Sequence, residues 1–107
     1  MTDYTDTGGL RSGISYWGGM NATWPFAKLR ATAGQIDITL RGLISSDEHF
    51  TFKKEDIVAL RRKRGLFSVG LEIQHQVKAY APYILFWSFR FSELRSKLEE
   101  RGFVVEA

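Results

Sequence analysis

The chain has 107 residues, of which 44% are hydrophobic, 25% charged and 14% aromatic, a composition typical of one compact globular domain rather than a disordered or fibrous chain. It contains no Cys and two His, which excludes a disulfide framework, a thiolate zinc site and a cysteine nucleophile, and predicts no metal site. The longest nearly apolar run, Ala79 to Phe89, is too short to span a bilayer. Because the N-terminus lacks a signal-peptide pattern, we expect a cytoplasmic location.

The basic residues are unevenly distributed along the chain. Fifteen Lys and Arg against twelve Asp and Glu give a net charge of +3. Six of the fifteen lie between residues 53 and 64, where Glu55 and Asp56 are the acidic residues. This segment alone therefore carries a net charge of +4, more than the whole chain. Such a concentration attracts anions. The candidate anion-binding residues of this segment are Lys53, Lys54, Arg61, Arg62, Lys63 and Arg64.

Residues 1–9 are polar and end in two glycines, which predicts a disordered tail followed by a single domain over residues 10–107. Leu10 to Trp17 is compatible with a first strand. The glycines at 18 and 19, together with Asn21, then favour a loop that leads to Trp24 and Pro25.

Two alternating runs on either side of Ala33 and Gly34 predict a β-hairpin. A turn centred there places Leu29 opposite Ile38 on the inner face. On the outer face it places Arg30 opposite Asp37 and Lys28 opposite Thr39.

Four further β-like segments follow, at residues 50–52, 57–61, 66–77 and 83–89. The longest alternation, in residues 66–77, places His75 on the apolar face, where we expect it to be partly buried and hydrogen-bonded. The basic run from Arg61 to Arg64 then falls at a hairpin tip, with Gly65 supplying a positive φ. Such a charged tip is also compatible with a purely solubilising role.

The period changes to that of a helix after Phe89. Phe91, Leu94 and Leu98 share one face, with charged residues elsewhere. Ser92 is the expected N-cap, and Gly102 is the expected C-terminal cap with Phe103 folding back on Leu98. The sequence therefore predicts one amphipathic helix after the strands.

This order of strands and helix resembles the bacterial pleckstrin-homology-like superfamily, including GRAM-type domains. The resemblance is carried by Trp-Pro-Phe-Ala-Lys-Leu-Arg at residues 24–30, by residues 55–57 and 64–75, and by Ile-Leu-Phe-Trp-Ser at residues 84–88. It implies a mainly β fold: a barrel of about seven antiparallel strands in two near-orthogonal sheets, capped by one C-terminal helix. Domains of this kind mostly bind lipids, peptides or proteins and are not enzymes.

The phosphoinositide motif of the superfamily is matched only in its second half, by Lys28 and Arg30. The first half requires a basic residue near the end of the first strand, where Tyr16, Trp17 and Gly18 stand. Arg30 has an alternative role as the cross-strand partner of Asp37.

No catalytic spacing or cofactor motif occurs in the sequence, so we expect a noncatalytic module without a cofactor. The leading hypothesis is protein association, with itself or with another chain, through the aromatic-rich loop around Met20, Trp24 and Phe26 or through an unpaired sheet edge that could accept a strand. The alternative is peripheral binding to anionic membrane lipid through Lys28, Arg30 and the basic segment of residues 53–64. Nucleic-acid binding by the same basic groups is the third hypothesis.

Overall fold

The computed structural model describes residues 2–13, 20–42, 47–65 and 68–106. Within these ranges the chain forms eight strands, one short 3-10 helix and one α-helix. In chain order they are β1 (Tyr4–Gly13), β2 (Met20–Ala31), β3 (Gln35–Leu40), β4 (Glu48–Lys53), η1 (Lys54–Asp56), β5 (Ile57–Arg64), β6 (Val69–His75), β7 (Tyr83–Ser88), α1 (Phe91–Glu100) and β8 (Val105–Glu106). The mainly β class with one helix after seven strands is as the sequence predicts, and β8 adds a short strand beyond it.

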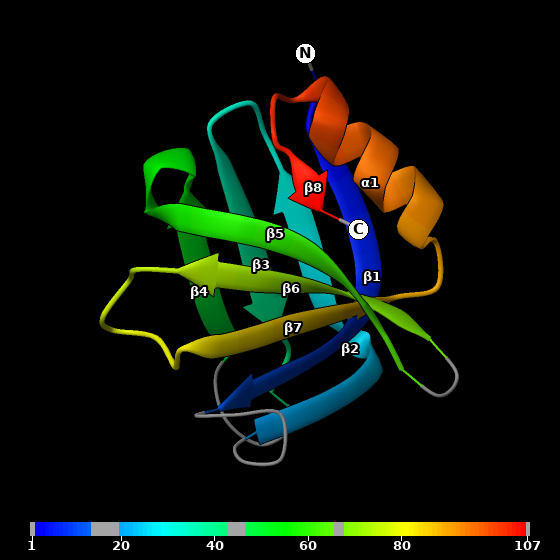
Figure 1. Ribbon diagram of the computed structural model, residues 1–107. Helices are drawn as coiled ribbons and strands as arrows, with labels where there is room; N and C mark the ends of the chain where they lie inside the picture. Colours follow the sequence, from blue (N-terminus) through cyan, green and yellow to red (C-terminus); the bar gives the residue numbers. More distant parts are fainter. Residues whose placement is uncertain (1, 14–19, 43–46, 66–67, 107) are drawn as a thin grey trace.

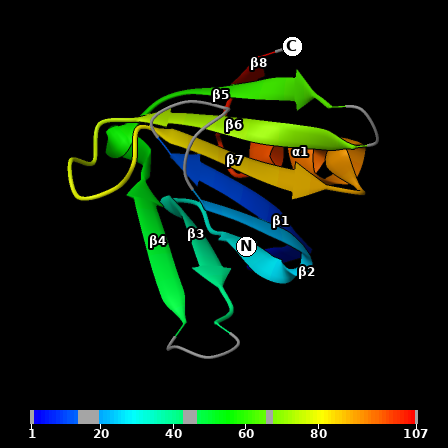
Figure 2. The ribbon, with the colours of Figure 1, turned by 90° about the horizontal axis from the view of Figure 1, so that it is seen from below.

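The described strands form one open sheet in the order β4-β3-β2-β1-β7-β6-β5-β8. Neighbouring strands are antiparallel, except that β8 runs parallel to β5. The sheet is strongly bent, so β5, β6 and β7 cross in front of β3 and β4 (Figure 1). Figure 2 shows the same bend from below, with β3 and β4 leaving the plane of β5–β7. The two halves of the sheet thereby enclose a common interior.

The prediction of two near-orthogonal sheets that close a barrel is wrong. Residues Gly8 to Ser12 of β1 pair with β7, and most of them also pair with β2, so one continuous ladder joins the two halves. In the described part of the chain no ladder connects β4 to β5 or β8. The sheet therefore keeps two edges.

The predicted hairpin is confirmed in its register. Leu29 pairs with Ile38, Arg30 with Asp37, and Lys28 with Thr39. Leu29 and Ile38 are fully buried, because the alternation of two residues puts them on the same face as the interior.

The N-terminal segment corrects the prediction of a disordered tail over residues 1–9. β1 begins at Tyr4 and pairs with β2 from its first residue. The two glycines that suggested flexibility are instead sites of close approach: a Cβ on Gly8 would overlap the Trp87 carbonyl oxygen, and one on Gly9 would lie 2.7 Å from the Ala22 carbonyl oxygen. At the helix end, the buried Arg101 side chain donates to the carbonyl oxygen of Thr2.

Two other boundaries differ from the sequence prediction. Asn21, expected in a loop, lies in β2, and the basic run Arg61–Arg64 lies within β5 rather than at a hairpin tip.

Gly65 does not have the predicted positive φ, since Gly102 is the glycine with positive φ among the described residues. Gly65 instead makes room for the Trp87 ring, whose Cη2 would lie 2.7 Å from a Cβ at that position. The predicted strand residues 14–17 and 66–67 lie outside the described ranges.

The helix packs as predicted, with Phe91, Leu94 and Leu98 buried. Its N-cap is Arg90 rather than Ser92. At its other end Gly102 has φ of 88°, and its N–H donates to the Glu99 carbonyl at 3.1 Å while the Phe103 N–H donates to that of Leu98 at 3.1 Å. This pair of bonds is a Schellman motif, which requires the left-handed residue that glycine supplies.

The core joins both halves of the sheet and the helix in one cluster. It contains Ile36 and Phe52 from one half, Leu71 and Phe86 from the other, and Leu98 from α1. Burial of such apolar surface is the main term that stabilises a domain of this size.

Replacing Leu98 by Ala should lower the free energy of unfolding by about 2 to 5 kcal/mol, because the side chain is fully buried and its loss leaves a cavity. Urea denaturation followed by circular dichroism measures the change. Ser96→Ala, at an exposed position of the same helix, should change stability by less than about 0.5 kcal/mol. Equal midpoints for Leu98→Ala and the wild type would contradict the packing of the helix against the sheet.

Replacing Gly8 by Ala should destabilise the fold by about 1 to 3 kcal/mol or more, because the added Cβ meets the Trp87 backbone and lies 2.8 Å from Cζ of Phe86. Gly34→Ala is the matched control, since a Cβ there meets no atom within 4 Å. Thermal unfolding of the two variants side by side measures the difference. If Gly34→Ala were the more damaging change, the close approach of β1 to β7 would not be a structural requirement.

Candidate functional site

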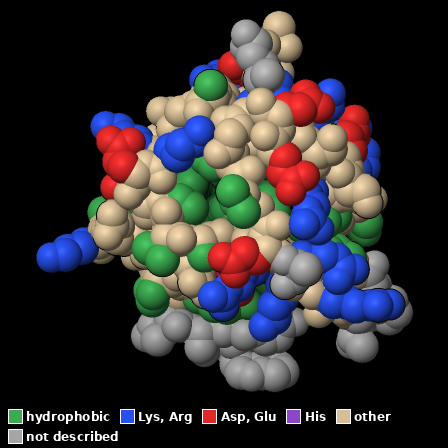
Figure 3. Space-filling view, turned by 45° about the horizontal axis from the view of Figure 1, so that its top comes forward, with side chains coloured by type: hydrophobic (Ala, Val, Ile, Leu, Met, Phe, Trp, Pro, Cys, Tyr) green, Lys and Arg blue, Asp and Glu red, His purple; other side chains and the backbone are tan. Residues whose placement is uncertain are grey.

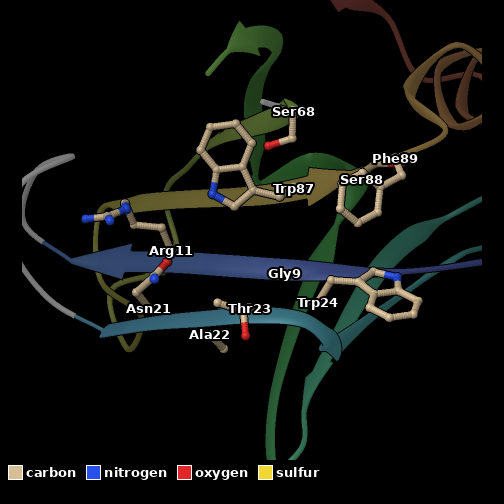
Figure 4. A pocket seen from close by; sticks show the side chains of 10 residues that line it. All are labelled: Gly9, Arg11, Asn21, Ala22, Thr23, Trp24, Ser68, Trp87, Ser88 and Phe89. Atoms are coloured by element: carbon tan, nitrogen blue, oxygen red, sulfur yellow. The ribbon is translucent and has the colours of Figure 1, made fainter. Parts of the chain in front are cut away.

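A groove of about 290 Å³ lies on the face of the sheet opposite the core, above β1. We call it the aromatic groove, and its lining residues are Gly9, Arg11, Asn21, Ala22, Thr23, Trp24, Ser68, Trp87, Ser88 and Phe89. Figure 4 shows Trp87 on β7 along one side, Thr23 on β2 along the other, Arg11 and Asn21 at one end, and Trp24 and Phe89 at the opposite end. The groove is therefore polar at one end and aromatic at the other.

Glycines on both sides of Trp87 create the space for this groove. Trp87 pairs with Gly9 of β1 and with Gly70 of β6. A Cβ on Gly70 would lie 3.1 Å from Cε3 of Trp87. Because neither neighbour has a side chain, the indole ring is flanked by bare backbone, and the groove remains open beside it.

The other side of the groove is formed where β2 departs from regular pairing with β1. Gly8 pairs with Ala27 and Leu10 with Ala22, so the residues between Ala22 and Ala27 form a bulge opposite Gly9. Bulges bend a strand and redirect its side chains. Here the bulge contains Trp24 and Thr23, two residues that line the groove.

Trp24 and Phe89 are among the most exposed large apolar side chains of the described chain, at 54% and 69%. Their ring centroids are 6.1 Å apart in an edge-to-face arrangement. The two residues come from β2 and from the connection between β7 and α1, so the pair is assembled only by the fold. An exposed aromatic cluster of this kind is typical of an interaction surface.

Of the three predicted protein-interaction residues, Trp24 lies in the groove. Phe26 is half-buried in β2 and lines a separate depression beside Pro25 and Arg41. Met20 begins β2, and its side chain lies outside the described part. Sequence reasoning missed Trp87 and Phe89 as groove residues, because they appeared as members of an apolar strand and their partner glycines are distant in the sequence.

The predicted basic residues do not form one surface. Lys28 and Arg30 lie on β2 in a depression that also contains Asp3 and Asp37. The Arg30 Nε is 3.4 Å from an Asp3 carboxylate oxygen and 3.9 Å from one of Asp37. Two carboxylates thus offset the two cations, and the local field that would attract a phosphate headgroup is weak.

The segment of residues 53–64 is divided between the two ends of β5. Lys53 ends β4, and Lys54 lies in η1, where its Nζ donates to the Arg101 carbonyl at 3.2 Å and lies 4.9 Å from the centre of the Phe103 ring. Seven residue steps separate Ile57 from Arg64 along β5, a distance of more than about 20 Å in a strand. The hairpin end and the neighbouring strand therefore do not present all six basic residues on one face.

Within β5 the basic side chains alternate between faces. Arg61 is 3.1 Å from a Glu106 carboxylate oxygen across the β5–β8 pair. Lys63 pairs with Gly70, the neighbour of Trp87, and Arg64 pairs with Val69. In the space-filling view basic side chains gather toward this end of β5, and hydrophobic side chains occupy the middle of the same face (Figure 3). Lys63 thus lies in register with Trp87 on the β6 side, whereas Arg64 belongs to the other face of the sheet.

A buried polar cluster joins β1 to the start of the helix. Asp6 is 2% exposed, and it accepts a hydrogen bond from the Ser88 hydroxyl at 2.5 Å and one from the Arg90 guanidinium at 3.2 Å. The bond with Asp6 raises the pKa of Arg90. Both carboxylate oxygens are thereby engaged, which satisfies a charge that would otherwise be costly to bury. The cluster fixes Ser88, a groove residue, against β1.

His75 is half-buried and hydrogen-bonded, as predicted. The Val77 N–H donates to Nδ1 at 3.0 Å, and Nε2 lies 2.9 Å from the Ala81 carbonyl oxygen. Since Nδ1 accepts, the Nε2–H must donate, which assigns the neutral tautomer. The ring thus holds the β6–β7 connection in place.

Comparison of the chain with protein-family models, with curated proteins and with solved structures found no match. Among the described helices, none has the length and apolar character needed to cross a bilayer. The functional argument therefore depends on the geometry of the groove.

The stability of the fold should fall between pH 10 and pH 12 because of Tyr4. Burial, followed by the nearby Asp6 and Glu93 carboxylates, raises the pKa of Tyr4 to about 12, from an ordinary value of about 10 in the unfolded chain. The folded state therefore holds the phenol proton more tightly, and this stabilisation is complete below about pH 10 and is lost as the pH rises to about 12.

Urea denaturation of the wild type and of Tyr4→Phe at a series of pH values measures this contribution. The variant has no phenol to ionise, so its free energy of unfolding should fall less steeply over that interval. An identical fall in both proteins would show that the ionisation of Tyr4 is not coupled to folding.

Proposed function

We propose that the chain is a noncatalytic pleckstrin-homology-like module that mediates protein association through the aromatic groove. The observation that carries this proposal is the exposed pair of Trp24 and Phe89 beside Trp87. Aromatic side chains dominate the energetics of protein interfaces because they bury a large area at a low cost in side-chain entropy. Burying this pair against a partner would remove from water two of the most exposed apolar rings of the described chain.

The order of elements along the chain is the feature that supports the resemblance on which this proposal draws. Seven strands precede the helix, and the helix contributes Leu94 and Leu98 to the core of the bent sheet. An open sheet of this kind leaves the face opposite the core available for binding, and the groove lies on that face.

The distribution of charge favours protein association over the membrane alternative. Arg30 and Arg61 are engaged with carboxylates, and Lys54 is engaged with the helix C-terminus and Phe103. Membrane attraction depends on several basic groups that reach one plane together. Here Lys53 and Arg64 lie near opposite ends of β5.

Selection of peptides from a random displayed library against the immobilised chain tests this proposal. We compare the wild type with the double variant Trp24→Ala/Phe89→Ala. The matched control is Val58→Ala/Val104→Ala, which removes side chains that are 66% and 78% exposed outside the groove. The wild type and the control should enrich the same peptides, and the groove variant should bind them at least about tenfold more weakly. Circular dichroism confirms that each variant folds.

Two outcomes would contradict the proposal. One is enrichment of the same peptides by the groove variant. The other is binding to anionic vesicles or to oligonucleotides that the groove variant retains but that Arg61→Glu/Arg62→Glu/Arg64→Glu loses, which would move the function to the basic end of β5.

A further inference from the structure

Independently of the aromatic groove, we infer that a second surface of the chain binds a second copy of the same chain in a two-fold dimer. We call it the valine surface. Val58 of β5 and Val104 of the connection between α1 and β8 form its centre, and Lys54 and Glu106 lie at its ends. In the dimer the valines of the two copies pack together, and Lys54 of each copy pairs with Glu106 of the other.

The centre of the valine surface is apolar and open to solvent. Beside the two rings of the aromatic groove, Val58 and Val104 are the large apolar side chains that the described part of the chain leaves exposed. They border a hollow of about 180 Å³, whose apolar lining also includes Ile57, Leu60 and Phe103. In the space-filling view hydrophobic side chains gather in the middle of this face, with charged side chains around them (Figure 3). An apolar centre inside a polar rim is the usual anatomy of a protein interface.

The two charged residues that line this hollow have opposite signs and lie at opposite ends of it. Lys54 precedes β5, and its Nζ donates to the carbonyl of Arg101, which precedes the exposed valine of the α1–β8 connection. Glu106 pairs with Arg61, beyond the exposed valine of β5. A surface with one charge of each sign on either side of an apolar centre is complementary to itself after a half-turn. The rotation brings each Lys54 to the Glu106 of the other copy.

Both charged groups have the capacity for this additional partner. Lys54 is exposed, and its ammonium has three donors, of which one is used on the Arg101 carbonyl. Glu106 has a side chain that is 53% exposed, and the Arg61 guanidinium engages its Oε1. The dimer therefore keeps the contacts within each copy and extends them across the interface.

The adjoining edge of the sheet is closed to an added strand. The Arg95 guanidinium of α1 donates to the carbonyl of Val105 in β8 at 3.1 Å. This bond engages an edge carbonyl that a further strand would need as its acceptor. An extended peptide is therefore a poor occupant, and contact between the side chains of two folded copies is favoured.

Sedimentation velocity of the whole chain, from about 1 to about 500 μM, tests this inference. The valine surface is small, so we expect a reversible dimer with a Kd of about 10 to 100 μM. Val58→Ser/Val104→Ser should weaken the dimer at least about tenfold, since it makes the centre polar. Trp24→Ala/Phe89→Ala is the matched control, because it removes the other exposed apolar pair, and it should leave the dimer unchanged. Circular dichroism confirms that each variant folds.

An exchange of charges tests the two-fold arrangement. In a dimer of Lys54→Glu, or of Glu106→Lys, both charged contacts join groups of like sign. Each variant alone should therefore dimerise at least about tenfold more weakly than the wild type. An equimolar mixture of the two variants has groups of opposite sign at both contacts, so it should dimerise about as tightly as the wild type. Mixing would not rescue a variant that had merely lost its fold.

A wild type that stays monomeric over the whole range would overturn the inference, and so would assembly that continues beyond the dimer. A mixture of the charge variants that dimerises no better than either alone would do the same. Loss of the dimer in Trp24→Ala/Phe89→Ala but not in Val58→Ser/Val104→Ser would place self-association in the aromatic groove and overturn the valine surface. The proposed function keeps its separate test, because the substitutions in the valine surface leave the aromatic groove intact.

Discussion

The close approach of β1 to β7 at Gly8 and to β2 at Gly9 is the constraint on which the rest of the structure depends. Gly8 pairs with Ala27 on one side and with Ser88 on the other, so the two halves of the sheet meet at this residue. The same approach allows Ser88 to reach Asp6 and sets Trp87 beside bare backbone. These two close approaches thus shape both the junction between the halves of the sheet and the groove beside it.

Features that depend on local periodicity were predictable from the sequence. The pairing of Leu29 with Ile38 follows from two alternating runs about one turn, and the burial of Leu94 and Leu98 follows from helical spacing. The cap at Gly102 follows from its position after the last apolar residue. Each needs information from only about ten neighbouring residues, within which the geometry of a helix or hairpin is nearly fixed.

Features that depend on distant pairing were not predictable in the same way. The row of Gly9, Trp87 and Gly70 joins three strands, and no local pattern distinguishes a glycine that admits an indole ring from one in a flexible tail. Charge counting failed for a related reason. It places Lys53 near Arg64 along the sequence, whereas β5 separates them, with Lys53 before its start and Arg64 at its end. The sequence signal that could have revealed the close approach of the strands is the pair of adjacent glycines, Gly8 and Gly9, since glycine within a strand often marks a site where another backbone approaches closely.

The central place of β1 also has a consequence for the order of events in folding. β2 with β3, and β5 with β6, are hairpins that close short loops, whereas the contact of Gly8 with Ser88 closes a loop of about eighty residues, which carries a larger entropic cost. Domains dominated by such non-local pairings fold slowly. We therefore expect the hairpins to form and dissolve repeatedly before β7 docks on β1, and the aromatic groove, which has one side on β7 and the other on β2, to be among the last surfaces to acquire its shape.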